Sequence, residues 1–302
     1  MSFVYLFAYI VLFLFGISIG SFLNVVIDRL PKRKPIGKSR SICPNCEKVL
    51  AWYDLVPLVS FISLGGKCRY CKKSIDPLLP IVEGVCGGAF VLAGLLGLGG
   101  VGGIGSLNVP NVTSFIKFIY LLIIFSVFVV IFFMDLKYKI IDDRIIVIGI
   151  ISSLLYLILN GAFALYNDYT ILSSDSFGKY LLKAGFLQKD LVYILKDFGL
   201  TLFLSFIIFL FFYFLILVTK GKGIGGADVK LAFLVGLFAG FPNALVSIFI
   251  SFLTGALAGI ILILVHRKSI KSRVAFGPFM VLGAILGYVF GGYVIRWYIG
   301  TF

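Results

Sequence analysis

Two aspartates stand out because each lies where a long uncharged segment meets a charged one. Asp135 directly follows SVFVVIFFM, and Asp228 follows the glycine-rich stretch GKGIGGA and precedes an uncharged run. Acidic groups at the edge of a membrane segment are costly and are therefore candidates for function. Two carboxylates brought close together share a proton, because both cannot ionise easily. Such a pair can activate a water molecule and polarise a carbonyl, which is the chemistry of an aspartyl peptidase.

Each aspartate alone also has a plain interpretation. Lys137 and Lys230 each follow their aspartate by two residues, so either carboxylate could be solvated or paired with its neighbour. No competing catalytic set accompanies them, because the single histidine, His266, lies beside Arg267 and Lys268. The chain therefore lacks a histidine to serve a serine or cysteine nucleophile.

Four cysteines form a second candidate site. Cys43 and Cys46 make one CxxC pair, and Cys68 and Cys71 make another further along the same charged segment. Two such pairs can close a tetrahedral structural zinc site, and four protein ligands leave no open position for catalysis. Disulfides are the alternative, and they are disfavoured in a cytoplasmic segment because thiols stay reduced there.

Membrane helices must position these residues. Hydrophobic residues make up 61% of the 302-residue chain, and the mean hydropathy is +1.12. Long uncharged runs recur along the chain, which predicts an all-α polytopic membrane protein with about eight transmembrane helices. The expected spans are 3–27, 84–105, 118–134, 145–166, 198–219, 223–241, 243–265 and 276–295, with a break at Pro242. A short amphipathic helix is expected around 179–197.

The distribution of charge gives the orientation. Most of the 27 lysines and arginines fall in the segments 28–77, 135–144, 220–230 and 266–273. An excess of basic residues marks the cytoplasmic side, so both aspartates and the cysteines are expected there. The net charge of +14 does not indicate nucleic-acid binding, because no basic helix or aromatic platform accompanies it. The basic loops 28–40 and 266–273 are instead expected to contact the lipid bilayer.

Three domains follow from this pattern. We expect a first transmembrane helix at 1–27, a small cytoplasmic zinc-binding tetracysteine domain at 28–83, and a seven-helix membrane domain at 84–302. The apolar segment LAWYDLVPLVSFISLGGK lies between the two cysteine pairs and is expected to pack on the membrane surface or on the helix bundle.

Five motifs, in order, resemble those of the type IV prepilin peptidases, which are integral-membrane aspartyl proteases. They are GSFLNVVIDRLP (20–31), the cysteine segment from CPNC to LPIVEG, MDLKYKIIDDRI, GIGGADVKL and VAFGPFMVLG (274–283). The resemblance covers most of the chain. It implies that Asp135 and Asp228 are the catalytic residues of a peptidase in the inner membrane. Its active site would face the cytoplasm, where it would remove the leader of prepilins or pseudopilins.

The resemblance also implies a second activity. Cysteine-containing members of the family generally methylate the new N-terminus with S-adenosylmethionine. Glu83, together with Asp54, is the candidate for the methyl-donor site. Leu78 and Leu79 stand where the family often has an arginine and an aromatic residue. The alternative function is a zinc-anchored membrane scaffold without catalysis, and nothing in the sequence indicates the oligomeric state.

Overall fold

The computed structural model of the chain describes residues 2–37, 41–98, 112–174, 176–220, 225–265 and 275–300. Every regular element within these residues is a helix, which confirms the all-α prediction. The glycines before Gly225 and the basic loop that contains His266 lie outside the described residues. The chain divides into two compact units, Met1–Tyr138 and Lys139–Phe302.

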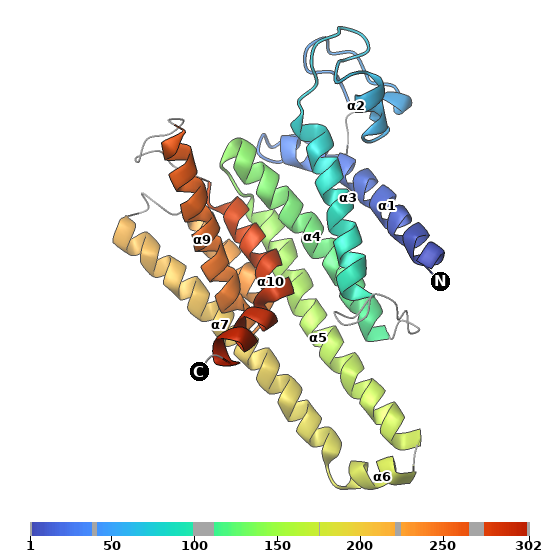
Figure 1. Ribbon diagram of the computed structural model, residues 1–302, viewed down its shortest axis with the longest axis vertical. Helices are drawn as coiled ribbons and strands as arrows, with labels where there is room; N and C mark the ends of the chain where they lie inside the picture. Colours follow the sequence, from blue (N-terminus) through green and yellow to red (C-terminus); the bar gives the residue numbers. More distant parts are fainter. Residues whose placement is uncertain are drawn as a thin grey trace. The chain divides into compact units, whose positions relative to one another are not determined.

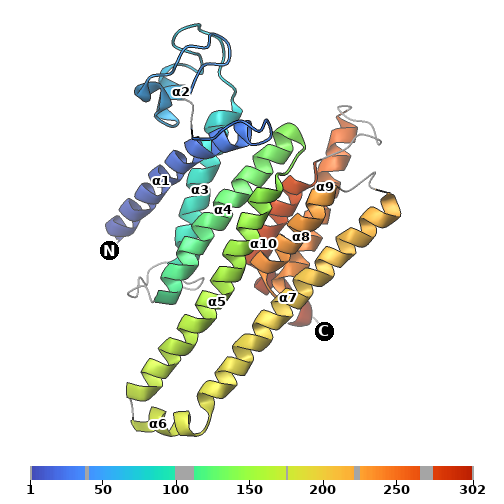
Figure 2. The same ribbon diagram turned by 180° about the vertical axis from the view of Figure 1, so that it is seen from behind.

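The first unit contains three long helices that lie side by side. These are α1 (Ser2–Arg29), α3 (Leu78–Gly97) and α4 (Val112–Tyr138), and both views show them together (Figures 1 and 2). Small residues bring α1 and α3 together, since a Cβ atom at Gly16 would lie only 2.8 Å from the Cys86 carbonyl oxygen. Close backbone approach of this kind is typical of helices that associate in lipid. The helix α3 begins earlier than expected because prolines are tolerated in a first turn.

Residues 41–77 form a small module between α1 and α3, which we call the cysteine module. It contains the 3-10 helix η1 (Trp52–Leu55) and the short helix α2 (Val59–Ser63). Isolated β-bridges close each cysteine turn, joining Ile42 to Val49 and Lys67 to Ser74. Figure 1 shows the module at one end of α1 and α3. The module consists mostly of loops, so groups that cross-link these loops must supply much of its stability.

The described residues of the second unit form six helices. They are α5 (Asp143–Ser174), α6 (Ser176–Lys183), α7 (Phe186–Thr219), α8 (Gly226–Ala239), α9 (Asn243–Leu264) and α10 (Gly277–Gly300). The helices α5 and α7 extend well beyond their uncharged runs, and α6 joins their ends (Figure 2). The amphipathic helix expected around 179–197 is therefore divided between α6 and the first turns of α7.

Seven helices of the described residues are long and apolar enough to span a membrane: α1, α3, α4, α5, α7, α9 and α10. The remaining expected span, 223–241, corresponds to α8, which has 14 residues. At 1.5 Å per residue α8 is about 21 Å long, short of a hydrocarbon core of about 30 Å. As predicted, α9 begins directly after Pro242.

The interior of the second unit is built around α8. Most of its apolar side chains are buried, from Val229 to Ala239. A Cβ atom at Gly236 would lie 2.7 Å from the Cα atom of Ser205 in α7, so these two helices touch through their backbones. The position of the α8 N-terminus, which carries Asp228, therefore depends on close packing along the whole helix.

Candidate active site and cysteine cluster

The four cysteines of the cysteine module come together as one cluster. Their sulfur atoms all lie within 4.8 Å of one another, and none forms a disulfide. The Sγ atoms of Cys43 and Cys71 are 3.8 Å apart. Zinc–sulfur bonds of about 2.3 Å in a tetrahedron place sulfurs about 3.8 Å apart, so the cluster could hold zinc.

The two cysteine turns repeat one backbone pattern. In the first, the Cys43 N–H donates to the Lys48 carbonyl, and the Glu47 N–H donates to the Cys43 carbonyl. In the second turn, the Cys68 N–H donates to the Lys73 carbonyl, and the Lys72 N–H donates to the Cys68 carbonyl. Each turn thus points two sulfurs inward, as zinc knuckles do.

Backbone N–H groups already prepare one of the sulfurs for a metal. Hydrogen bonds from the backbone of Asn45 and then Cys46 lower the pKa of the Cys43 thiol to about 6. At its neighbour Cys46, the hydrogen bond from the Lys48 backbone is outweighed by burial and by hydrogen bonds with Cys43 and Cys71, which raise the pKa of Cys46 to about 11. A metal binds the thiolate, so the environment of Cys43 favours the ligating form.

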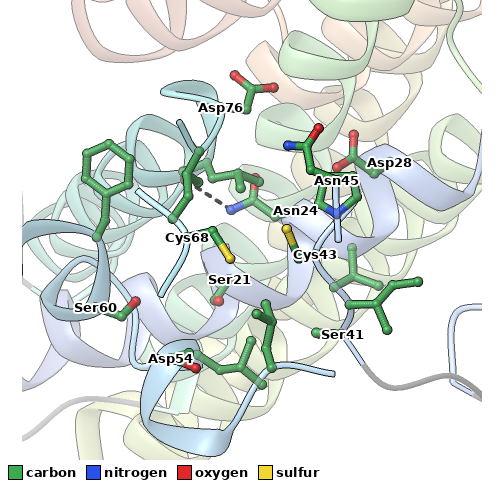
Figure 3. A pocket seen from close by; sticks show the side chains of 18 of the residues that line it. Ser21, Asn24, Asp28, Ser41, Cys43, Asn45, Asp54, Ser60, Cys68 and Asp76 are labelled. Carbon is green, nitrogen blue, oxygen red and sulfur yellow. Dashed lines mark hydrogen bonds between the residues drawn. The ribbon is translucent and has the colours of Figure 1, made fainter. Parts of the chain in front are cut away.

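A cavity of about 850 Å³ lies beside the cluster, between the cysteine module and the ends of α1, α3 and α4. Figure 3 shows side chains from α1 and from the module pointing into it. Two of the sulfurs, those of Cys43 and Cys68, belong to its wall. Polar side chains of α1, α3 and the cysteine module also line it, among them Ser21, Asn24, Asp28, Asp54, Asp76 and Glu83. The cavity is large enough for a nucleotide-sized ligand.

Glu83 and Asp54, the candidates for the methyl-donor site, both line this cavity. The Glu83 carboxylate is buried and accepts the Leu58 N–H at 2.8 Å. The Asp54 side chain is 3% exposed, and its Oδ1 accepts from Arg69 Nε at 2.7 Å. Its other oxygen, Oδ2, is buried and has no hydrogen-bond partner among the described residues. Buried polar atoms normally have a partner, so this oxygen marks a position for a donor group.

Asp135 is buried in the last turn of α4, only 6% exposed. Lys137, two residues later, binds Asp28 of α1 at 2.9 Å and Asp76 of the cysteine module at 3.0 Å. Tyr138 donates to the same Asp28 carboxylate at 2.8 Å. The C-terminal end of α4 is thus tied to two other segments of its unit.

Asp28, Asp76 and Lys137 form a charged cluster. Asp76 is the acid of this cluster that lies outside the membrane helices. Burial raises its pKa, but the Leu78 N–H and the Lys137 ammonium outweigh this and hold the pKa of Asp76 below its usual value. Asp76 is therefore ionised at neutral pH and remains a partner for Lys137.

Asp228 lies in the first turn of α8 and is half-buried. Its Oδ2 accepts the Gly225 N–H at 2.9 Å, and its own N–H donates to the Gly225 carbonyl at 3.1 Å. The bond to Oδ2 is the half of a capping box that the third helical residue supplies, and Gly225 has no side chain to supply the other half. Lys230, two residues later, binds Asp143 of α5 at 2.7 Å.

Both lysines that follow the candidate catalytic aspartates are ion-paired with acids of other segments. Asp135 belongs to the first unit and Asp228 to the second, and their pairing as a dyad stays a prediction. The cluster of Asp28, Asp76 and Lys137 was not predicted from the sequence. Asn24 and Asp28 are four residues apart on α1, so helical spacing could have identified them as one polar face.

Comparisons with known proteins place both parts of the chain in one peptidase family. Residues 14–96 match the bacterial peptidase A24 N-terminal domain, and residues 122–260 match the type IV leader peptidase family. A protein of Bacillus subtilis (strain 168) named prepilin leader peptidase/N-methyltransferase is 30% identical over 289 residues, which covers 96% of this chain and 97% of that protein. A protein of the same name from Aeromonas salmonicida (strain A449) is 25% identical over 315 residues, covering 96% and 93%.

Local similarity is higher in one region. A Myxococcus xanthus (strain DK1622) protein, also named prepilin leader peptidase/N-methyltransferase, is 47% identical over 79 residues, which is 26% of this chain and 24% of that protein. No solved structure matches the chain.

Proposed function

The chain belongs to the type IV leader peptidase family, and we propose that it cleaves the leader from prepilins or pseudopilins and then methylates the new N-terminus. The observation that carries this proposal is the end-to-end similarity to the Bacillus subtilis relative, over 96% of the chain at 30% identity. A membrane scaffold without catalysis would retain the cysteine cluster but would not need carboxylates at Asp135 and Asp228.

Asp135 and Asp228 are proposed as the catalytic pair. One carboxylate is charged and takes a proton from water, while the protonated one donates a hydrogen bond to the carbonyl oxygen of the scissile bond. The water oxygen then bonds to the carbonyl carbon. As the carbon–nitrogen bond breaks, the leaving amine takes a proton from the pair. The position of each aspartate at a helix end supports this role, because both can reach polar groups at the membrane surface.

The excess of lysine and arginine in the segments that flank both aspartates supports a cytoplasmic active site. We propose that the protein lies in the inner membrane, with the leader of the substrate on the cytoplasmic side.

Methylation is assigned to the cavity beside the cysteine cluster. S-adenosylmethionine carries a positive sulfonium, an ammonium and a ribose diol, and it supplies the methyl group when bound. The residues present fit such a ligand. Asp54 Oδ2 is a buried acceptor without a partner among the described residues, and Glu83 adds a second carboxylate. These two acids would hold the donor groups, while zinc at Cys43, Cys46, Cys68 and Cys71 would keep the cavity wall in shape.

Co-expression with a prepilin, followed by intact-mass measurement of the product, tests both activities. Asp135→Asn and Asp228→Asn are each expected to lower cleavage by at least about a hundredfold, because each removes one ionisable partner of the pair. Asp142→Asn, in the same sequence motif as Asp135, serves as the matched control and should cleave normally. Full cleavage by either catalytic variant would refute its assignment.

The methyl mass is read in the same experiment. Asp54→Asn and Glu83→Gln are expected to release the leader but to leave the product without the added methyl group. If both variants still methylate fully, the donor does not bind in this cavity. If wild type leaves the leader in place, the scaffold function is favoured.

A further inference from the structure

The cysteine module has an apolar surface that the described helices leave open. Trp52 of η1 is 79% exposed and Ile62 of α2 is 76% exposed, and Val59 of α2 is exposed as well. We call these three residues the Trp52–Ile62 patch. The two short helices that carry it pack against each other. Large apolar side chains gathered on a small module indicate an interaction surface.

One hydrogen bond fixes how deep α2 lies along the membrane helices. The N–H of Leu58, directly before α2, donates to the Glu83 carboxylate in the second turn of α3. Glu83 lies roughly 6–8 Å along the helix axis from the first residue of α3. Ile81 and Val85 flank Glu83 and are exposed apolar residues of a membrane-spanning helix. Therefore α2 begins at the depth where α3 already presents apolar side chains outward.

The backbone conformation of Leu58 also indicates that the start of α2 is held at this position along α3. Its φ is 58°, in the left-handed region that non-glycine residues rarely occupy. The bond to Glu83 compensates for this backbone cost, so the start of α2 is held against α3 rather than resting there loosely.

The chemistry of the module around the patch matches a membrane–water interface. Trp52 and Tyr53 contact each other edge to face with ring centroids 5.7 Å apart, and Arg69 lies 4.9 Å from the Tyr53 ring. Tryptophan and tyrosine gather at headgroup level in membrane proteins, and long cationic side chains reach from there toward water. Exposed Lys48 and Lys67 add positive charge, which complements anionic headgroups.

We propose that the Trp52–Ile62 patch inserts into the headgroup region of the lipid bilayer and holds the cysteine module against the membrane surface. The partner is the bilayer rather than a protein, because the patch begins at the depth of the outward-facing side chains of α3. The short helix α2 then behaves as an interfacial helix, with its apolar side in lipid. This proposal does not depend on the catalytic assignments.

Tryptophan fluorescence of the full-length protein tests the proposal. The chain has two tryptophans, so Trp297→Phe leaves Trp52 as the sole reporter. This variant is reconstituted into vesicles of phosphatidylcholine and phosphatidylglycerol, with or without bromine on the acyl chains. We expect brominated lipid to remove most of the Trp52 emission and aqueous iodide to have little effect. Strong quenching by iodide without quenching by bromine would overturn the proposal.

A pair of charge substitutions makes the test specific to the patch. In the Trp297→Phe background, Ile62→Asp should abolish quenching by brominated lipid, because a carboxylate at this position resists insertion. Ser63→Asp adds the same charge to the neighbouring exposed position of α2 and should leave the quenching unchanged. The zinc content of both variants verifies that the module is folded. Equal loss in both variants would overturn the assignment to this patch. Protection from iodide without bromine quenching would also overturn it and would favour a protein partner.

Discussion

Asp135 and Asp228 lie in the same short pattern, Asp-x-Lys, but the two units hold them in different ways. Asp135 ends a long helix whose last turn is tied by Lys137 to two acids, Asp28 and Asp76. Asp228 begins a short helix whose first turn is closed by a glycine cap and whose body is fixed by backbone packing. Polar contacts therefore position the first aspartate, whereas small residues position the second. This difference predicts that the two units will respond to different kinds of substitution.

The largest loss of stability is expected from substitutions in the cysteine module, which belongs to the first unit and supplies Asp76 to the polar contacts near Asp135. Cys68→Ser should remove zinc from the purified protein and unfold the module, because structural zinc contributes on the order of 10 kcal/mol to such small folds. Metal analysis and limited proteolysis of residues 41–77 measure this. Cys86→Ala, a buried cysteine of α3 outside the cluster, is the matched control and should keep its zinc. Equal zinc content in the two variants would contradict the four-cysteine site.

A single methyl group should disturb the second unit. Gly236→Ala places a Cβ atom against the Ser205 backbone and should lower the free energy of unfolding by about 1–3 kcal/mol. Cleavage should also fall, because α8 carries Asp228. Gly259→Ala in α9 is the control, since no atom of another described helix lies within 4 Å of its Cβ position. Thermal unfolding in detergent distinguishes the two variants, and a neutral Gly236→Ala would show that α7 and α8 can separate at little cost.

Lys137 and Lys230 occupy the same position of the Asp-x-Lys pattern, so substituting each one tests how differently the two units are stabilised. Lys137 is 26% exposed and bridges two carboxylates, so Lys137→Met should destabilise the protein by about 1–3 kcal/mol and leave two acids facing each other. Lys230 is 50% exposed in a single surface pair, so Lys230→Met should cost less than about 1 kcal/mol. Unfolding measured at low and high salt tests this difference. The positions would be equivalent if both variants lost the same stability.

The smallest effect is expected at Asp142, where two substitutions distinguish a role in helix capping from a role in catalysis. Its Oδ1 accepts the Arg144 N–H at 2.9 Å at the start of α5. Asp142→Asn keeps a side chain that can cap the helix and should behave as wild type in both stability and cleavage. Asp142→Ala should lose about 1 kcal/mol of stability with cleavage retained. Loss of cleavage in the asparagine variant would move Asp142 into the catalytic set.

Features with a local cause could be predicted from the sequence. Uncharged runs located the membrane helices, Pro242 marked the break before α9, and CxxC spacing identified all four members of the cysteine cluster. These signals depend on a few neighbouring residues, so no knowledge of the fold was needed.

Features that depend on distant residues were missed. The bridge between Lys137 and Asp28 joins positions more than a hundred residues apart, and only the packing of α1 against α4 brings them together. The ends of α5 and α7 were also missed, because charged residues such as Asp168 and Asp190 interrupt the uncharged runs without interrupting the helices.

The hydrogen bond from Leu58 to Glu83 also constrains how the protein is made. Glu83 is synthesised after Leu58 and belongs to α3, the second helix to enter the membrane. The ribosome therefore completes the cysteine module before the acceptor for its strained residue exists. The module can reach its final form only once α3 has been inserted. Membrane insertion therefore acts as the last folding step of a domain that lies at the membrane–water interface.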